Sequence, residues 1–379
     1  MYRLAFLGAA ILLFGVTVFN YYQYPKRWRN KKWFRILLKI LHILGMTSLA
    51  LVFTMYRYLP YEWLKWTVSR WASLYLYMTL LIEFGFLVRM AVVGIYRLIM
   101  KIRKLDIKDR PVRKIADKRT HSFAFFVIAF IIATTGFVNI GILRATSYDV
   151  RIHKNSVNDH LTVALIADVH AGAGTWRMTY ADLTRKLQDT QCDVLLIAGD
   201  VFDETTSDED IRYFTEALKT VKPKYGKFFV YGNHDDYHED WAADVIRAMD
   251  VTVLKDEMVT IAGDVQLIGR LDPIDNRMEL DELFDTLPLD TEKPILMLTH
   301  RPKEFRKMSE EGCDLVTAGH THGYNIPDAP LISMLNDVVY GMRTYGDMTA
   351  VVTSGVSAWG FHYKFPAISE VVTIHLSFD

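Results

Sequence analysis

The sequence has few cysteines, no excess of charge of either sign, and no internal repeat or low-complexity tract. Two cysteines in 379 residues, Cys192 and Cys313, exclude a disulfide framework, and we expect both thiols to be buried and reduced. Lysine plus arginine and aspartate plus glutamate each number 44, so no net charge favours a nucleic-acid partner, and none is expected. The length and the 51% hydrophobic share allow two domains, one of them rich in apolar residues.

Charge is also scarce within four stretches of the first 145 residues. These apolar runs cover residues 4–25, 36–56, 71–96 and 122–143, and the charged residues inside them are Lys39, Glu83 and Arg89. Each run is close to the roughly 20 residues that cross a bilayer as a helix. The first run lacks a small-x-small cleavage site, so we interpret it as a retained span and not as a signal peptide. The sequence therefore predicts a membrane domain of four transmembrane helices over residues 1–145.

The basic residues between these runs predict the orientation of the chain. Segments 26–35 and 97–119 are rich in lysine and arginine, whereas segment 57–70 carries only Arg57, Lys65 and Arg70. Because positively charged loops stay in the cytoplasm, the amino terminus and everything after the fourth span are predicted to lie outside it. The expected location is the plasma (inner) membrane, with residues 146–379 extracytoplasmic.

Beyond residue 145, short apolar runs alternate with amphipathic segments, which predicts an α/β domain over residues 146–379 with a β-rich tail. Ser207 and Asp210 resemble a capping box, and Gly312 suits the end of a helix. The predicted strands are 161–167, 194–198, 227–231, 265–268, 295–298, 315–318, 350–353 and 371–376. The predicted helices are 180–188, 208–220, 239–249, 280–287 and 303–311.

Five of the predicted strands are followed directly by residues that can bind metals. They are Asp168 and His170, Asp200 and Asp203, Asn233 with His234 and Asp235, His300, and His320 with His322. Singly, each has an ordinary interpretation as a loop histidine or a helix-capping aspartate. Together they indicate one site, because ligands in an open α/β sheet bind beyond the carboxyl ends of the strands. Oxygen and nitrogen donors without cysteine suit manganese, iron, zinc or cobalt, and so many donors favour two divalent ions.

The motif order D-x-H, G-D-x-x-D, G-N-H-D, H and G-H-x-H resembles the calcineurin-like metallophosphoesterase family over roughly residues 158–379. The segment 319–327, which contains G-H-T-H-G and a later proline, resembles its membrane-associated bacterial branch. The resemblance implies two β-sheets flanked by helices. It also implies a hydrolase that cleaves phosphoester or pyrophosphate bonds with a hydroxide activated between two divalent metal ions.

The resemblance assigns a role to each residue of the motifs. One metal ion would be held by Asp168, His170, Asp200 and His322, and the second by Asp200, Asn233, His300 and His320. His234 would act on the substrate as the catalytic residue, and Asp203 and Asp235 would orient the ligands. Arg270 and Arg343 are candidate substrate contacts, with an ordinary ion pair as the alternative for each. The sequence departs from the family pattern at Tyr324, where a second glycine is usual, and in having Lys364 near the position of an arginine.

The substrate is less closely defined by the sequence. The aromatic segment 359–365 either packs against the sheet or contacts lipid, since tryptophan and tyrosine favour the bilayer interface. A tether to the membrane favours a phosphorylated, lipid-linked or cell-envelope substrate. Two alternatives stay open. One is a pyrophosphatase of the UDP-diacylglucosamine type in lipid A synthesis, against which the predicted outside location argues. The other is a non-catalytic metal-binding sensor or scaffold.

Overall fold

The computed structural model describes residues 2–103, 118–172, 175, 177–235, 239–273, 277–325 and 329–379. The chain divides into two compact units. The first comprises Met1–Met55 and Tyr61–Phe137, and the second comprises Tyr56–Pro60 and Val138–Asp379. Most of the predicted basic segment 97–119 lies outside the described residues.

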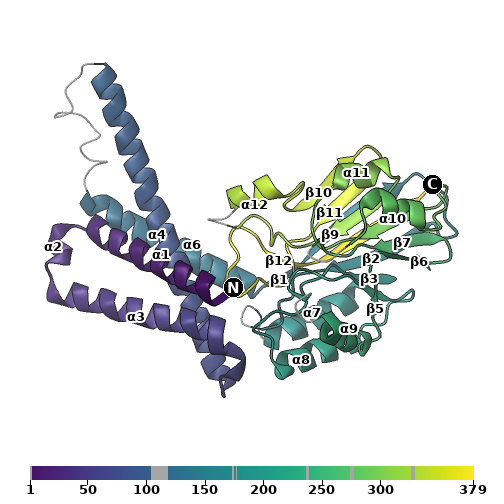
Figure 1. The fold of residues 1–379 in the computed structure, drawn as a ribbon, viewed down its shortest axis with the longest axis horizontal. Helices are drawn as coiled ribbons and strands as arrows, with labels where there is room; N and C mark the ends of the chain where they lie inside the picture. Colours follow the sequence, from purple (N-terminus) through teal and green to yellow (C-terminus); the bar gives the residue numbers. More distant parts are fainter. Residues whose placement is uncertain are drawn as a thin grey trace. The chain divides into compact units, whose positions relative to one another are not determined.

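The first unit consists of long apolar helices (Figure 1). They are α1 (Tyr2–Gln23), α3 (Lys32–Met55), α4 (Glu62–Ile102) and α6 (Lys118–Ile140), with a short α2 (Lys26–Arg29). Among the described residues three stretches, not four, are long and apolar enough to cross a membrane: Lys32–Val52, Trp63–Ile102 and Phe123–Ile140. The prediction of four spans is therefore confirmed for three. The first predicted run does form helix α1, but the side chains of its first half lie outside the described residues.

Helix α4 is longer than the sequence pattern predicted. The predicted span began at Trp71, and Lys65 and Arg70 were assigned to a loop, whereas the helix begins at Glu62 and runs for 41 residues. Both cations lie on the helix and are buried. The guanidinium of Arg70 lies 5.5 Å from the ring centroid of Trp66, one helical turn away, so a cation–π contact supports the first turns. The two charges led to the prediction of a loop, because a hydropathy pattern does not detect a contact between a cation and an aromatic ring.

The second unit contains two mixed sheets. The first has the order β1-β12-β2-β3-β4-β5, in which β12 and β2 are antiparallel and the other neighbours are parallel. The second has the order β10-β11-β9-β8-β7-β6, with antiparallel pairs at both edges and parallel strands between them. The strands are β1 (Leu143–Ile152), β2 (His160–Ile166), β3 (Val194–Ile197), β4 (Lys227–Phe229), β5 (Thr252–Val253), β6 (Glu257–Ile261), β7 (Val265–Gly269), β8 (Ile295–Leu298), β9 (Leu315–Ala318), β10 (Gly341–Tyr345), β11 (Met348–Val352) and β12 (Ser369–Phe378).

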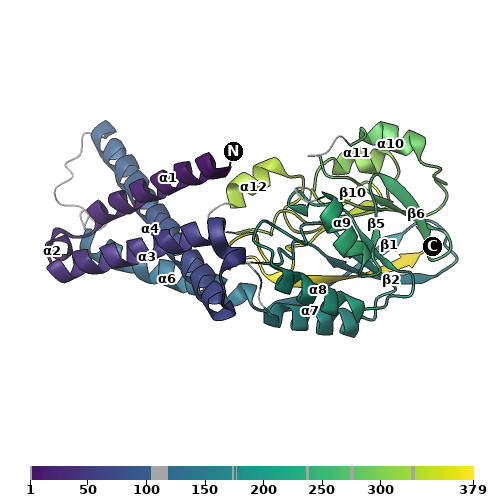
Figure 2. The same cartoon turned by 60° about the horizontal axis from the view of Figure 1, so that its bottom comes forward.

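The two sheets pack face to face and are covered by helices on their outer faces (Figures 1 and 2). A continuous apolar core fills the space between the sheets. Helices α7 (Arg177–Thr190), α8 (Asp208–Lys219) and α9 (Glu239–Arg247) pack on the first sheet. Helices α10 (Leu280–Thr286) and α11 (Phe305–Glu310) pack on the second. A 3₁₀ turn (Tyr56–Tyr58) and α12 (Ala329–Leu335) complete the described elements of this unit. The predicted α/β fold with two sheets is confirmed.

All the strands and helices predicted after residue 145 are present, whereas β1, β5, β6, β10 and α12 were not predicted. Strand β1 was missed because it lies at a sheet edge and its charged residues Arg144, Asp149 and Arg151 are all exposed. Its ten residues are held in a strand by parallel pairing with β12, which the local sequence does not reveal. The predicted capping box is present: the backbone N–H of Asp210 donates to Ser207 Oγ, and the N–H of Ser207 donates to Asp210 Oδ2.

Candidate metal centre

The five motifs meet where parallel strands of both sheets end. Asp168, Asp200 and Asn233 follow β2, β3 and β4 of the first sheet. His300 and His320 follow β8 and β9 of the second. Because the sheets pack face to face, the carboxyl ends of these strands bring together residues that are up to about 150 positions apart in the chain.

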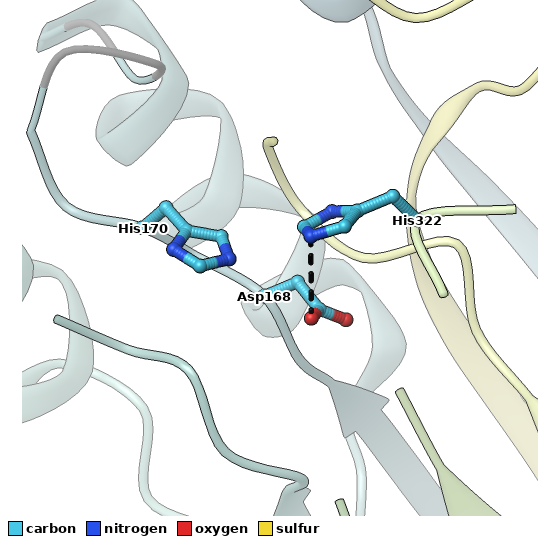
Figure 3. A group of neighbouring side chains, drawn as sticks. All are labelled: Asp168, His170 and His322. Atoms are coloured by element: carbon cyan, nitrogen blue, oxygen red, sulfur yellow. Dashed lines mark ion pairs between the residues drawn. The ribbon is translucent and has the colours of Figure 1, made fainter. Parts of the chain in front are cut away.

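One cluster consists of Asp168, His170 and His322, whose donor atoms lie within 4.8 Å of one another. Figure 3 shows the three side chains pointing toward one another, with His322 Nε2 3.8 Å from Asp168 Oδ1. Among the described residues, neither ring nitrogen of His170 nor Nδ1 of His322 has a hydrogen-bond partner, although all three atoms are buried. Buried nitrogen atoms without partners are costly, so this arrangement fits a bound cation.

The second cluster consists of Asp200, His300 and His320, whose donor atoms also lie within 4.8 Å of one another. His300 Nε2 lies 3.2 Å from Asp200 Oδ2, 3.1 Å from His320 Nδ1 and 3.2 Å from the amide oxygen of Asn233. The other ring nitrogen of His300 lies 2.7 Å from the carbonyl oxygen of Ala198, to which it can only donate. This hydrogen bond fixes Nδ1 as a donor, so Nε2 is the ring nitrogen that faces the cluster and that can bind a metal ion once it has lost its proton.

Asp200 faces both clusters. Its Oδ2 lies 3.6 Å from His170 Nε2 of the first cluster and 3.2 Å from His300 Nε2 of the second. Its Oδ1 accepts the backbone N–H of His234 at 2.8 Å, which fixes the rotation of the carboxylate. Two donor sets that share one carboxylate fit two divalent cations held side by side.

The surroundings shift the pKa values of His300, His320 and His322 in different directions. Burial, reinforced by the nearby His300, lowers the pKa of His320 to about 2. Burial and the neighbouring His170 hold the pKa of His322 well below its usual range. Burial also opposes charge on His300, but the Asp200 carboxylate outweighs it and raises the pKa of His300 to about 10. Neutral His320 and His322 are in the form that metal binding requires.

Two further carboxylates support the ligands. Asp235 accepts four backbone N–H groups, those of Asp200, Val201, Phe202 and Gly232. It therefore ties the loop after β3 to the loop after β4. Asp203 accepts the backbone N–H and the hydroxyl of Thr205 through Oδ1, while its Oδ2 lies 3.4 Å from His170 Nδ1. These are the positions expected of residues that orient ligands without binding the ions.

The backbone at the site adopts a conformation that residues other than glycine rarely adopt. The φ angles of Asp168, His170, Asp200, His320 and His322 are 51°, 42°, 52°, 73° and 53°. Each such left-handed residue costs about 1–3 kcal/mol and persists only where its surroundings enforce it. Gly232 is needed for a different reason: a Cβ there would lie 2.2 Å from Asp200 Oδ1. The loops are therefore shaped to bring donors together at the expense of local stability.

His234 lies beside both clusters and belongs to neither. Its ring centroid is 5.1 Å from that of His170 and 5.2 Å from that of Trp359. Its Nδ1 lies 3.5 Å from Glu204 Oε2, and Trp359 Nε1 donates to Glu204 Oε1 at 3.1 Å. Burial lowers the pKa of His234, but the carboxylates of Glu204, Asp200 and Asp203 together outweigh it and raise that pKa overall. Glu204 was not predicted to be functional, because it belongs to none of the five motifs. A glutamate in a loop is usually exposed to solvent.

The two candidate substrate arginines have other partners. The Arg270 side chain is buried, and it donates to Asp256 Oδ1 at 2.9 Å and to the Met278 carbonyl oxygen at 2.6 Å. Arg343 is exposed on β10, where it lies over the ring of Tyr345 and 3.3 Å from the Asp337 carbonyl oxygen. Arg270 thus forms the ion pair that was its alternative. Arg343 forms no ion pair with a described carboxylate, and its contact with substrate stays a prediction.

Lys364 is also occupied within the protein. It is fully buried, and its amine donates to the carbonyl oxygens of Ser354, Gly355 and Ile368. Burial lowers its pKa to about 7. The amine thus holds the turn at Gly355, where a Cβ would lie 2.6 Å from Asp168 Cβ. Lys364 supports the backbone beside Asp168 and does not replace an arginine that contacts substrate.

Comparison with known proteins agrees with this geometry. Residues 161–324, which include all of the cluster residues, match the family model described as calcineurin-like phosphoesterase. The chain contains a calcineurin-like metallophosphoesterase domain. The predicted family and enzyme class, a phosphoester hydrolase, are confirmed. The family typically uses two divalent metal ions, and its activity implies a phosphorylated substrate.

Several named proteins are similar to the chain. An uncharacterized metallophosphoesterase of Helicobacter pylori strain J99 is 28% identical over 265 residues, covering 66% of this chain and 70% of that protein. A transmembrane protein with metallophosphoesterase domain from Danio rerio is 26% identical over 271 residues, covering 66% of this chain and 61% of that protein. A crystal structure of a Thermus thermophilus protein aligns over 51% of this chain and 88% of its own, with 13% identity and a TM-score of 0.34. The apolar helices and the transmembrane relative together indicate membrane association.

Proposed function

We propose that residues 146–379 form a dinuclear metal-dependent phosphohydrolase and that residues 1–145 anchor it in a membrane. The observation that supports this most directly is the pair of donor clusters that share Asp200. A structural metal site would be closed by one set of four ligands, whereas two adjoining sets with a shared carboxylate are arranged for catalysis.

The proposed ligand sets follow the two clusters. Asp168, His170, Asp200 and His322 would hold one ion, and Asp200, Asn233, His300 and His320 would hold the other. When bound, the two ions would activate water and withdraw charge from the phosphoryl oxygens of a phosphorylated substrate. Manganese, iron, zinc and cobalt all suit these donors. Asp203 would keep the His170 ring in position, and Asp235 would hold the backbone of the loop that carries Asp200.

His234 is proposed as the catalytic acid. Its backbone N–H is fixed by Asp200, and its ring is held between His170 and Trp359. The side chain is thus placed next to both donor clusters without belonging to either. An imidazole in this position can hold a proton at a ring nitrogen and deliver it to the departing oxygen of the substrate.

We further propose a lipid-linked or cell-envelope phosphoester or pyrophosphate as the substrate. Trp359, beside His234, is 38% exposed at the rim of the site. Helix α12, a few residues beyond His322, exposes Leu331, Met334 and Leu335 by 59%, 83% and 56%. Exposed apolar side chains on the domain that carries a phosphoesterase site favour an amphiphilic substrate over a fully soluble one.

The test combines metal analysis of the purified full chain with a panel of phosphomonoester, phosphodiester, pyrophosphate and polyprenyl phosphate substrates. We expect about two metal ions per chain and turnover of at least one lipid-linked substrate. His234→Ala should lower turnover by about two to four decades while metal content stays near normal. Asp200→Asn should lose metal. The control is His160→Ala at an exposed position of β2, which should change neither turnover nor metal content.

Three outcomes of this test would each contradict one part of the proposal. Parental turnover by metal-loaded His234→Ala protein would contradict the role of His234. Full metal content without turnover of any phosphorylated compound would favour the sensor or scaffold. Turnover of soluble esters together with no turnover of any lipid-linked compound would contradict the lipid substrate alone.

A further inference from the structure

The helices of the first unit enclose a cavity of about 710 Å³ that the proposed hydrolase does not use. Its wall comes from α1, α3, α4 and α6, and most of the lining residues are aromatic or aliphatic, among them Phe14, Trp71, Leu74, Ile82, Phe126 and Phe130. This volume is within the range of cavities that hold a small organic ligand, about 300–1,000 Å³.

A polar stripe of helix α3 lines the same cavity. Arg35, Lys39 and His42 follow one another at spacings of four and three residues, so they lie on one face of the helix. Arg35 and Lys39 are exposed, whereas His42 is half-buried. The stripe therefore runs from the end of the apolar span Lys32–Val52 roughly 10 Å toward its middle. Ionisable residues within a membrane span face a bundle interior or a cavity, and they usually mark a functional site.

The positive charge of this stripe is not balanced by any carboxylate among the described residues. Neither Arg35 nor Lys39 forms an ion pair with a carboxylate in the part of the chain that the structure describes. A third cation, Arg29, lies 5.7 Å and 5.4 Å from the ring centroids of Tyr21 and Tyr22, both of which line the cavity. Exposed cations in the wall of an apolar cavity fit an anionic head group whose hydrophobic part fills the interior.

Deeper in the cavity, polar atoms are left for a ligand. His42 Nδ1 lies 2.5 Å from the hydroxyl of Tyr75, and that hydroxyl is 3.4 Å from Thr17 Oγ1. Asn20 is 6% exposed and donates through Nδ2 to the Thr79 carbonyl oxygen at 3.3 Å. Its Oδ1 has no partner among the described residues. A buried amide oxygen at a cavity wall without a partner is an acceptor for a ligand hydroxyl.

We propose that this cavity binds a phosphorylated membrane lipid, with its phosphate at Arg35 and Lys39 and its apolar chain among the aromatic residues. The inference does not rest on the proposed hydrolase, because none of the residues involved belongs to the metal centre. The apolar lining favours a lipid over free phosphate, and the cations favour an anionic lipid over a neutral one.

The test uses the full chain in detergent–lipid micelles and a phosphatidic acid that carries a photoreactive diazirine in one acyl chain. The matching diazirine-bearing diacylglycerol serves as the neutral probe, and inorganic phosphate serves as a competitor. We expect phosphatidic acid to label cavity residues such as Ile82 and Trp71. The double substitution Arg35→Gln and Lys39→Gln should weaken its binding by about 30-fold, since each cation contributes a factor of about five. Diacylglycerol labelling should stay weak and unchanged.

The matched control is Lys31→Gln with Lys32→Gln, which removes the same charge from exposed residues that do not line the cavity. A second variant, Leu74→Trp, fills the cavity without changing charge and should also abolish labelling there. Equal weakening in both charge variants would overturn the proposal, as would labelling confined to exposed residues such as Phe84. Displacement of the lipid by millimolar inorganic phosphate would indicate a free-anion site and would also overturn it.

Discussion

At the residue scale, His234 depends on two side chains that the sequence motifs do not include. Trp359 and Glu204 are hydrogen-bonded to each other, and both contact the imidazole. We predict that Glu204→Gln lowers turnover by about tenfold, less than the roughly 10²–10⁴ that His234 itself contributes, because the ring loses its charged partner. Metal content should not change. The measurement is kcat with metal analysis on the same sample.

The control for Glu204 is Glu216→Gln, which removes an exposed carboxylate that pairs with Arg212 on helix α8. It should leave turnover unchanged. Loss of metal from the Glu204→Gln protein would instead place Glu204 among the residues that hold the ions, contrary to the proposed role.

Gly232 is a second residue at which the site tolerates no change. A Cβ at this position would lie 2.2 Å from Asp200 Oδ1 and 2.5 Å from the Asp200 backbone nitrogen. We predict that Gly232→Ala weakens metal binding by about 10–100-fold, because it displaces the carboxylate that faces both clusters. Titration of the metal-free protein with manganese or zinc measures the effect.

Gly312→Ala is the matched control for Gly232. Gly312 has a φ of 90° but no heavy atom within 4 Å of its Cβ position. The substitution should cost about 1–2 kcal/mol of stability through backbone strain and leave metal affinity unchanged. Equal metal affinities in the two variants would show that the close approach at Gly232 is unimportant.

At the scale of elements, helix α8 follows the loop that contains Asp203 and Glu204, so its first turn helps to hold that loop. Ser207 and Asp210 form its capping box. We predict that Ser207→Ala lowers the free energy of unfolding by about 1 kcal/mol, whereas Ser207→Gly costs only a few tenths. For a domain of this size, about 1 kcal/mol lowers the melting temperature by roughly 2–4 °C, which differential scanning calorimetry detects. Equal melting temperatures for the two variants would argue against the cap.

Elements also differ in how far the sequence predicts them. The inner strands β2, β3, β8 and β9 are buried on both faces and appear as continuous apolar runs. The edge strand β1 and the first turns of α4 carry charges that are compatible with their surroundings only after folding. The local sequence pattern therefore predicted the inner strands of each sheet but not the edge strands β1, β5, β6 and β10.

At the scale of the whole molecule, the proposed orientation distinguishes two substrates. The basic segments 26–35 and 97–119 predict that the carboxyl terminus lies outside the cytoplasm. We predict that alkaline phosphatase fused after Asp379 is active and that a green fluorescent protein fusion at the same point is dark. Fusions after residue 60, in the predicted outside loop, and after residue 110, in the predicted cytoplasmic loop, are the matched controls. The reverse pattern after Asp379 would place the metal centre in the cytoplasm and favour the UDP-diacylglucosamine-type substrate.

The sequence by itself determined the family, the order of the metal-binding motifs and the presence of apolar spans. These features follow from residue type and local spacing, and none of them depends on long-range packing. Only the tertiary structure decided that Asp200 faces both donor clusters, that Glu204 and Trp359 accompany His234, and that Arg270 and Lys364 are occupied within the protein. Such contacts join residues far apart in the chain, and local sequence does not encode their distances. The cavity lined by Arg35 and Lys39 could not be predicted from the sequence either, because it forms only where the helices pack together.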